Sequence, residues 1–238
     1  MVNKLEINVP ESFSDISLSQ YKEWVKLVEA VGEDKESKSD FLDRALIEVF
    51  CKVSIQDISS IKATEFSKIL VILQETFSKE SKELVTRFSI DGVEYGFEPN
   101  IQDMLTGVYI DTEAHISSWD NLHTAMAALY RPITHVRKVR GFEQYEIEKY
   151  SPSEEKSNKM LDMPLDAAMS AKVFFYSLGK ELSMITLVCL EEEKKKEQDI
   201  HQRKTLEQSG DGISQFIRSQ EEMHLNSMKQ HPYHYFKH

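Results

Sequence analysis

The dipeptide Asp91-Gly92 is the strongest local constraint on how this chain folds. It separates two short segments, Leu84–Ile90 and Val93–Phe97, that are rich in β-branched and aromatic residues. A two-residue turn between antiparallel strands needs positive φ angles, which Asp-Gly adopts readily. The sequence therefore predicts a β-hairpin with Asp91 and Gly92 at its tip.

A second hairpin is predicted around Gly141. Its arms are Thr134–Arg140 and Phe142–Tyr150, and the second arm alternates in character from one residue to the next. A period of two residues is typical of a strand, whose side chains point to opposite faces in turn. The two hairpins can join in one sheet packed on helices.

The N-terminal third of the chain has a helical period instead. An extended arm ends at Pro10, and either Ser17 or Ser19 can then cap a helix with apolar residues every three or four positions. Further helices are predicted to start at Asp40 and to span Ala63–Phe77. Since each helix can bury one face against the others, they form a small helical subdomain.

Most of the remaining chain is also predicted to be helical, because Gly (8) and Pro (6) are both few. One helix ends at Arg131-Pro132. Another, long and apolar, runs from Pro164 to about Leu190, after a polar loop over residues 151–163. Acids followed by bases come directly after it, a pattern that favours an exposed helix.

The predicted fold class is therefore α+β, helix-rich, with one or two antiparallel β-hairpins and extended N- and C-terminal segments. Four parts are expected along the chain. They are an N-terminal arm (1–16), a helical subdomain (17–80), an α+β body with two hairpins (81–190), and a projecting helix with a C-terminal docking tail (191–238).

Composition limits the partners of the chain. Forty acidic and 29 basic side chains give a net charge of −11, which repels phosphate backbones, so no specific nucleic-acid binding is expected. Cys51 and Cys189 each lie in an apolar run, as reduced, buried thiols of a cytosolic product do. No signal segment and no apolar run long enough to span a bilayer is present, so no membrane partner is expected.

The motifs of common catalytic and phosphate-binding sites are missing from the sequence. No catalytic residue and no cofactor is therefore predicted. His115, His123 and His135 lie close together in sequence, but the helical register sets His123 beside Met126. A partly buried structural histidine is the favoured interpretation of His123, ahead of a catalytic base.

The C-terminal tail contains three histidines at short separations that could bind zinc: His231, His234 and His238. No cysteine or carboxylate within the tail completes such a site, so no metal is predicted. The aromatic residues of the tail favour a docking role instead, since aromatic side chains anchor protein interfaces. These aromatic residues are Tyr233, Tyr235 and Phe236.

The basic concentration of the sequence consists of Arg131, Arg137, Lys138 and Arg140. It could touch a phosphate backbone, or pair with acids of a neighbouring subunit. Pairing is favoured because the chain is acidic as a whole. Four interface candidates follow, each expected to lack partners in its own core: the arm at Pro10, the tip at Asp91 and Gly92, the strand Arg137–Arg140, and the tail His231–His238.

Six short segments carry a resemblance to a known group of proteins. They are Val93-Glu94-Tyr95-Gly96-Phe97-Glu98-Pro99-Asn100, Leu105-Thr106-Gly107-Val108-Tyr109-Ile110-Asp111, Trp119-Asp120-Asn121-Leu122-His123, Leu129-Tyr130-Arg131-Pro132-Ile133, Val9-Pro10-Glu11-Ser12 and Ile16-Ser17-Leu18-Ser19-Gln20-Tyr21. Together they resemble small structural proteins encoded by crAss-like bacteriophages. No catalytic residue is carried over, because the role of such proteins is made by surfaces.

The resemblance implies a virion protein, made in the host bacterial cytoplasm, that forms one of the tail-barrel or head-to-tail connector rings below the portal. Its implied partners are copies of itself, commonly twelve, and the neighbouring ring, portal or adaptor proteins. The second hypothesis is a tail-assembly chaperone that is absent from particles. The third is an enzyme built from scattered histidines and carboxylates, and it is the least favoured.

Overall fold

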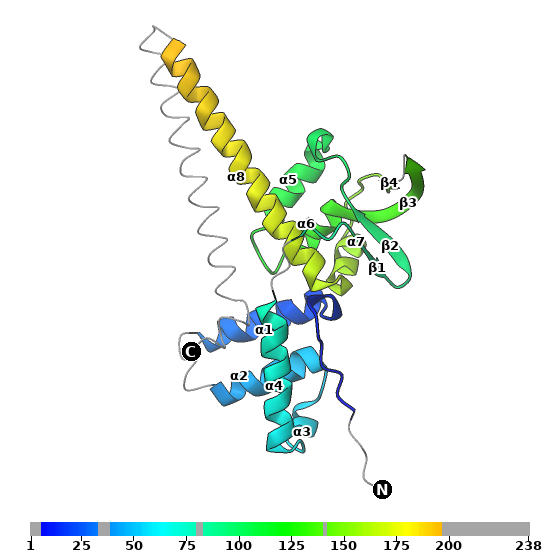
Figure 1. The fold of residues 1–238 in the computed structure, drawn as a ribbon, viewed down its shortest axis with the longest axis vertical. Coiled ribbons are helices and arrows are strands. Elements are labelled where there is room, and N and C mark those ends of the chain that lie inside the picture. The colour runs from blue at the N-terminus through cyan, green and yellow to red at the C-terminus, as the bar shows by residue number, and fades with distance from the viewer. Residues whose placement is uncertain (1–5, 33–38, 80–82, 140–141, 197–238) are drawn as a thin grey trace. The chain divides into compact units, whose positions relative to one another are not determined.

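The computed structural model describes residues 6–32, 39–79, 83–139 and 142–196 (Figure 1). They belong to two compact units, one that extends to Ala171 and one that begins at Lys172. The first unit contains every helix and strand up to the first residues of α8. The second contains the remainder of α8.

The predicted N-terminal helices are confirmed. They are α1 (Leu18–Val31), α2 (Ser39–Cys51) and α4 (Ala63–Ser78), with a further short helix, α3 (Ile55–Ile58). Ser17 rather than Ser19 caps α1, because its Oγ accepts from the backbone N–H of Gln20 while the Gln20 side chain accepts from the backbone N–H of Ser17. This reciprocal pair of bonds satisfies N–H groups that the start of a helix otherwise leaves open.

A row of aromatic rings forms the core of these helices. Trp24 of α1 lies 6.0 Å from Phe50 of α2, and Phe50 lies 4.8 Å from Phe77 of α4. Phe13 extends the row to the N-terminal arm, 5.7 Å from Phe77. All four side chains are buried, and each contributes roughly 1.5–3 kcal/mol relative to exposure.

Both predicted hairpins are confirmed, and they join in one antiparallel sheet of order β1-β2-β3-β4. The strands are β1 (Arg87–Ile90), β2 (Val93–Phe97), β3 (Tyr130–Val139) and β4 (Phe142–Ile147). Asp91 (φ 49°) and Gly92 (φ 77°) form the two-residue turn, with Ile90 paired to Val93. Positive φ at both positions is the geometry that the Asp-Gly pair predicted.

The sheet is strongly curled. Tyr145 of β4 donates a 2.8 Å hydrogen bond to the carbonyl oxygen of Phe97 on β2, although β3 lies between these strands in the sheet order. Its ring lies against Gly96, so that a Cβ atom at Gly96 would be only 2.4 Å from a ring carbon. The glycine is therefore required by close approach of a side chain, not by its own backbone angles.

Three more helices complete the first unit: α5 (Thr106–His115), α6 (Leu122–Leu129) and α7 (Glu154–Lys159). Short 3₁₀ turns are η1 (Phe13–Asp15), η2 (Ile101–Asp103) and η3 (Met160–Asp162). Helix α6 ends at Leu129, and Arg131 and Pro132 already lie in β3. The predicted loop over 151–163 is wrong, because Ser153 accepts from the backbone N–H of Lys156 and so caps α7.

Helix α8 (Leu165–Lys196) is 32 residues long and includes the predicted apolar helix and the charged run after it. It is continuous across residue 190, where the division between body and projecting helix was predicted. No helix in the described ranges is long and apolar enough to cross a membrane.

Gly96→Ala should destabilise the protein, because the added Cβ would lie 2.4 Å from the Tyr145 ring and 3.0 Å from the Ile133 side chain. Overpacking of this kind costs about 1–3 kcal/mol, which urea unfolding can measure. Gly179→Ala is the control, since a Cβ there meets no atom within 4 Å, and it should add up to about 1 kcal/mol of stability to α8. An unchanged unfolding midpoint for Gly96→Ala would contradict the close contact.

Candidate functional site

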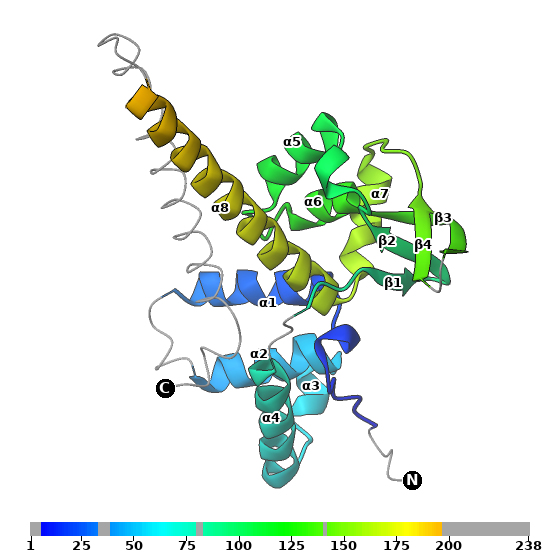
Figure 2. The ribbon, with the colours of Figure 1, turned by 45° about the horizontal axis from the view of Figure 1, so that its top comes forward.

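The free end of the β3–β4 ribbon is the most exposed part of the sheet. Cross-strand pairs His135–Glu146 and Arg137–Gln144 share one face of it, and all four side chains are exposed. We call these four residues the outer ribbon face. Val136 on the opposite face is also 42% exposed, so the ribbon is exposed on both faces at the residues whose side chains are described. In Figure 2 it extends away from α5 and α6.

The predicted basic concentration is divided between three environments. Arg137 is exposed and has no ion pair within the described part of the chain. Lys138 pairs with Glu143 across the ribbon at 3.4 Å, and Glu143 also pairs with Arg87 at 3.2 Å. Arg131 is buried, as described next. Arg140 lies outside the described residues.

Arg131 is the centre of a buried polar network. Its guanidinium group forms an ion pair with Glu98, and these two side chains are only 8% and 12% exposed. The guanidinium carbon also lies 5.8 Å from the centre of the Tyr150 ring. The Tyr150 hydroxyl in turn donates to the carboxylate of Asp111 on α5, and burial together with this bond raises the pKa of Tyr150. The network thus joins α5 to the sheet.

Helix α5 presents an apolar surface with one acid, which we call the α5 face. Its members are exposed: Leu105, Thr106, Tyr109, Ile110 and Glu113. Leu105 is 60% and Ile110 55% exposed, which is high for such large apolar side chains. Val108 and Thr112 on the other side of α5 are fully buried. The exposed and the buried side chains of α5 thus lie on different sides of the helix.

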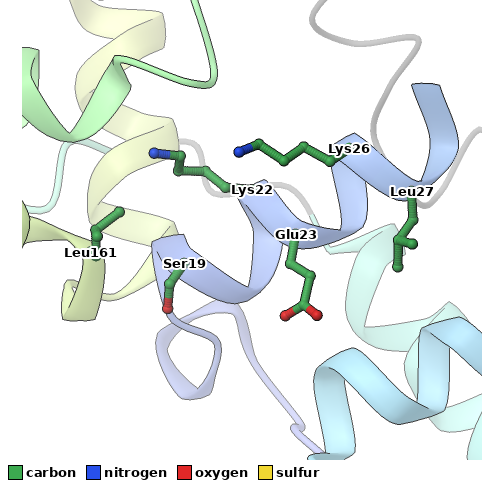
Figure 3. Close-up of a pocket in the computed structure, with 6 residues that line it drawn as sticks. All are labelled: Ser19, Lys22, Glu23, Lys26, Leu27 and Leu161. Atoms are coloured by element: carbon green, nitrogen blue, oxygen red, sulfur yellow. The ribbon is translucent and has the colours of Figure 1, made fainter. Parts of the chain in front are cut away.

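A cleft of about 440 Å³ lies along α1, lined by Ser19, Lys22, Glu23, Lys26, Leu27 and Leu161. Figure 3 shows Lys22 and Lys26 extending to one side of α1, with Glu23 and Leu27 on the other. The Lys22 ammonium group donates to the carbonyl oxygen of Asp120 at 2.7 Å, and Lys26 pairs with the Asp120 carboxylate at 3.2 Å. Both lysines thus bind the segment before α6, and the cleft suits a structural role.

His123 completes this contact, with its Nδ1 atom 3.2 Å from the Lys22 ammonium group. Burial lowers the pKa of His123 below its ordinary 6.5, and the charge of Lys22 lowers it further. His123 is half-buried, as predicted. His135 lies on the outer ribbon face, so the three histidines that are close in sequence do not form one site.

Two of the predicted interface candidates have partners in their own chain. Pro10 is buried, and its carbonyl oxygen accepts from the Thr76 hydroxyl at 3.0 Å. Asp91 at the hairpin tip is ion-paired with Lys159 of α7, while Gly92 next to it is exposed. The expectation that each candidate lacks partners in its own core is therefore wrong for Pro10. Asp91 is exposed, and its ion pair with Lys159 lies at the surface.

The C-terminal candidates lie outside the described residues. They are His231, Tyr233, His234, Tyr235 and Phe236, together with the third tail histidine, His238. In the ranges that the structure does describe, no three His, Cys, Asp or Glu side chains are grouped to hold a metal ion. Cys51 is buried as a free thiol, and burial raises its pKa to about 12.

Arg131→Met should destabilise the protein by about 3 kcal/mol, because Glu98 would be left buried without its partner. Chemical denaturation measures the loss. Lys68→Met is the control, since it removes an exposed ion pair with Glu65 and should change stability by less than about 0.5 kcal/mol. Similar losses for the two variants would show that the Arg131–Glu98 pair is not buried.

Acidification should weaken the wild type through His123. The pKa of His123 is lowered in the folded state, so the unfolded chain binds the proton more readily. The contribution of neutral His123 to the free energy of unfolding is therefore present above pH 6.5, and it is lost as the pH falls below that value. His123→Gln should therefore lose less stability than the wild type between pH 7 and about pH 5. An equal loss of stability in the two proteins would show that His123 does not carry this pH dependence.

Comparison of the chain with protein-family models, with curated proteins and with solved structures gave no match.

Proposed function

We propose that this chain is a structural subunit of a bacteriophage virion, which assembles with copies of itself into a ring of the tail barrel or head-to-tail connector below the portal. The observation that carries the proposal is the free end of the β3–β4 ribbon. It is exposed on both faces, and its Arg137 has no acid partner in the described ranges. Contact with another chain would satisfy both features.

The resemblance supports the virion context. Most of it lies between residues 93 and 133, which form β2, α5, α6 and the start of β3. This part of the molecule contains the Arg131–Glu98 pair and the whole α5 face. Most of the resemblance thus lies in the part of the first unit that presents the α5 face, as a protein that acts through surfaces requires.

The charge of the chain also agrees with a place beside a DNA conduit. A net charge of −11 repels the phosphate backbone, so DNA could pass without being held. Neighbouring ring, portal or adaptor proteins would be the other partners. A binding role for nucleic acid is correspondingly disfavoured, although the ribbon is basic.

The purified protein should form a discrete species far larger than the 27.6 kDa monomer, measured by light scattering over a concentration series. A ring of twelve copies would have a mass of about 331 kDa (12 × 27.6 kDa). The protein should also be found in purified phage particles by mass spectrometry.

Absence from purified particles would contradict the proposal and favour the tail-assembly chaperone. A monomer in solution that is nevertheless present in particles would indicate that a neighbouring protein, such as the portal, is needed as a template for assembly.

A further inference from the structure

We propose that the outer ribbon face of one copy docks on the α5 face of the next copy. The inference rests on the proposed self-assembly and adds the surfaces that make it. The α5 face supplies the apolar part of the contact through Leu105, Tyr109 and Ile110, with Glu113 one turn further along the helix. The ribbon supplies one cation, Arg137, on a protruding element.

One pair of opposite charges makes these two faces complementary. Arg137 on the outer ribbon face and Glu113 on the α5 face are both exposed, and neither forms an ion pair in the described ranges. The outer ribbon face also carries Glu146, opposite His135, so the contact must set Arg137 rather than Glu146 against Glu113. Opposite charges steer two surfaces together and fix their register.

The two faces are fixed in position within one unit. The Arg131–Glu98 pair and the bond from Tyr150 to Asp111 hold α5 to the sheet, and the ribbon is part of that sheet. In both views the free end of the ribbon lies away from α5 (Figures 1 and 2). Two different faces on one rigid unit give a head-to-tail contact, which closes into a ring when the rotation between copies permits.

A charge-exchange experiment on the full chain tests the docking. Arg137→Glu alone and Glu113→Arg alone should each raise the dissociation constant between copies at least about ten-fold, measured by sedimentation velocity over a concentration series. The double variant restores opposite charges and should recover most of the affinity. Arg44→Glu, an exposed arginine of α2, is the matched control and should assemble like the wild type.

A second measurement uses disulfides. A mixture of Arg137→Cys and Glu113→Cys chains should form a covalent dimer under mild oxidation, and it should do so faster than either variant alone. The single variants also serve as controls for disulfides formed by the native cysteines. Dimers of Arg137→Cys alone would indicate ribbon-to-ribbon contact and overturn the docking.

Assembly that neither charge reversal alters would also overturn the docking, yet leave the proposed ring intact. A wild type that stays monomeric at all concentrations would overturn docking between free copies. The proposed function would then be tested separately, by whether the protein is present in purified phage particles. In a further outcome, the wild type binds DNA and does not self-associate. If this binding is lost in Arg137→Glu but not in Glu113→Arg, the ribbon is assigned to nucleic acid instead.

Discussion

The ion pair between Arg131 and Glu98 is the constraint on which the rest of the first unit depends. Two charges removed from water are tolerated only when they are paired closely, so the end of β2 and the start of β3 must meet in one geometry. Tyr150 extends that geometry to Asp111 and so to α5. Four segments that are distant in sequence are therefore held by one connected set of polar contacts.

The curl of the sheet has a complementary effect. Tyr145 reaches over Gly96 to bond with β2, which buries the inner end of the β3–β4 ribbon. The pairing of β2 with β3 ends at Pro132, and beyond it no strand of the described ranges lies beside β3 on that side. The same bend that completes the core thus leaves the outer end of the ribbon without cover. An element exposed in this way is stable by itself only through its cross-strand pairs, and it is suited to contact with another molecule.

Local signals predicted the fold well, and contacts between distant residues could not be predicted. The Asp91-Gly92 turn and the apolar stripes of the first helices act over a few residues, so the sequence shows them directly. Helix α5 has apolar residues on both sides, so no apolar stripe in the sequence marks its buried side. The sequence therefore does not indicate that Ile110 is exposed while Val108 is buried. The partners in the buried network are 33 and 39 positions apart. The contact of Pro10 could not be predicted, because the Thr76 hydroxyl that donates to its carbonyl oxygen lies 66 positions away in the sequence.

The position of β4 at the edge of the sheet has a consequence for how the protein behaves in concentrated solution. An edge strand offers unpaired backbone groups to any other strand, and association through such edges can continue without limit into fibres. Glu146 places a negative charge on that edge, where a fibre would have to stack it at every layer. A substitution that neutralises this acid would therefore endanger solubility first, while the fold of each molecule stayed intact.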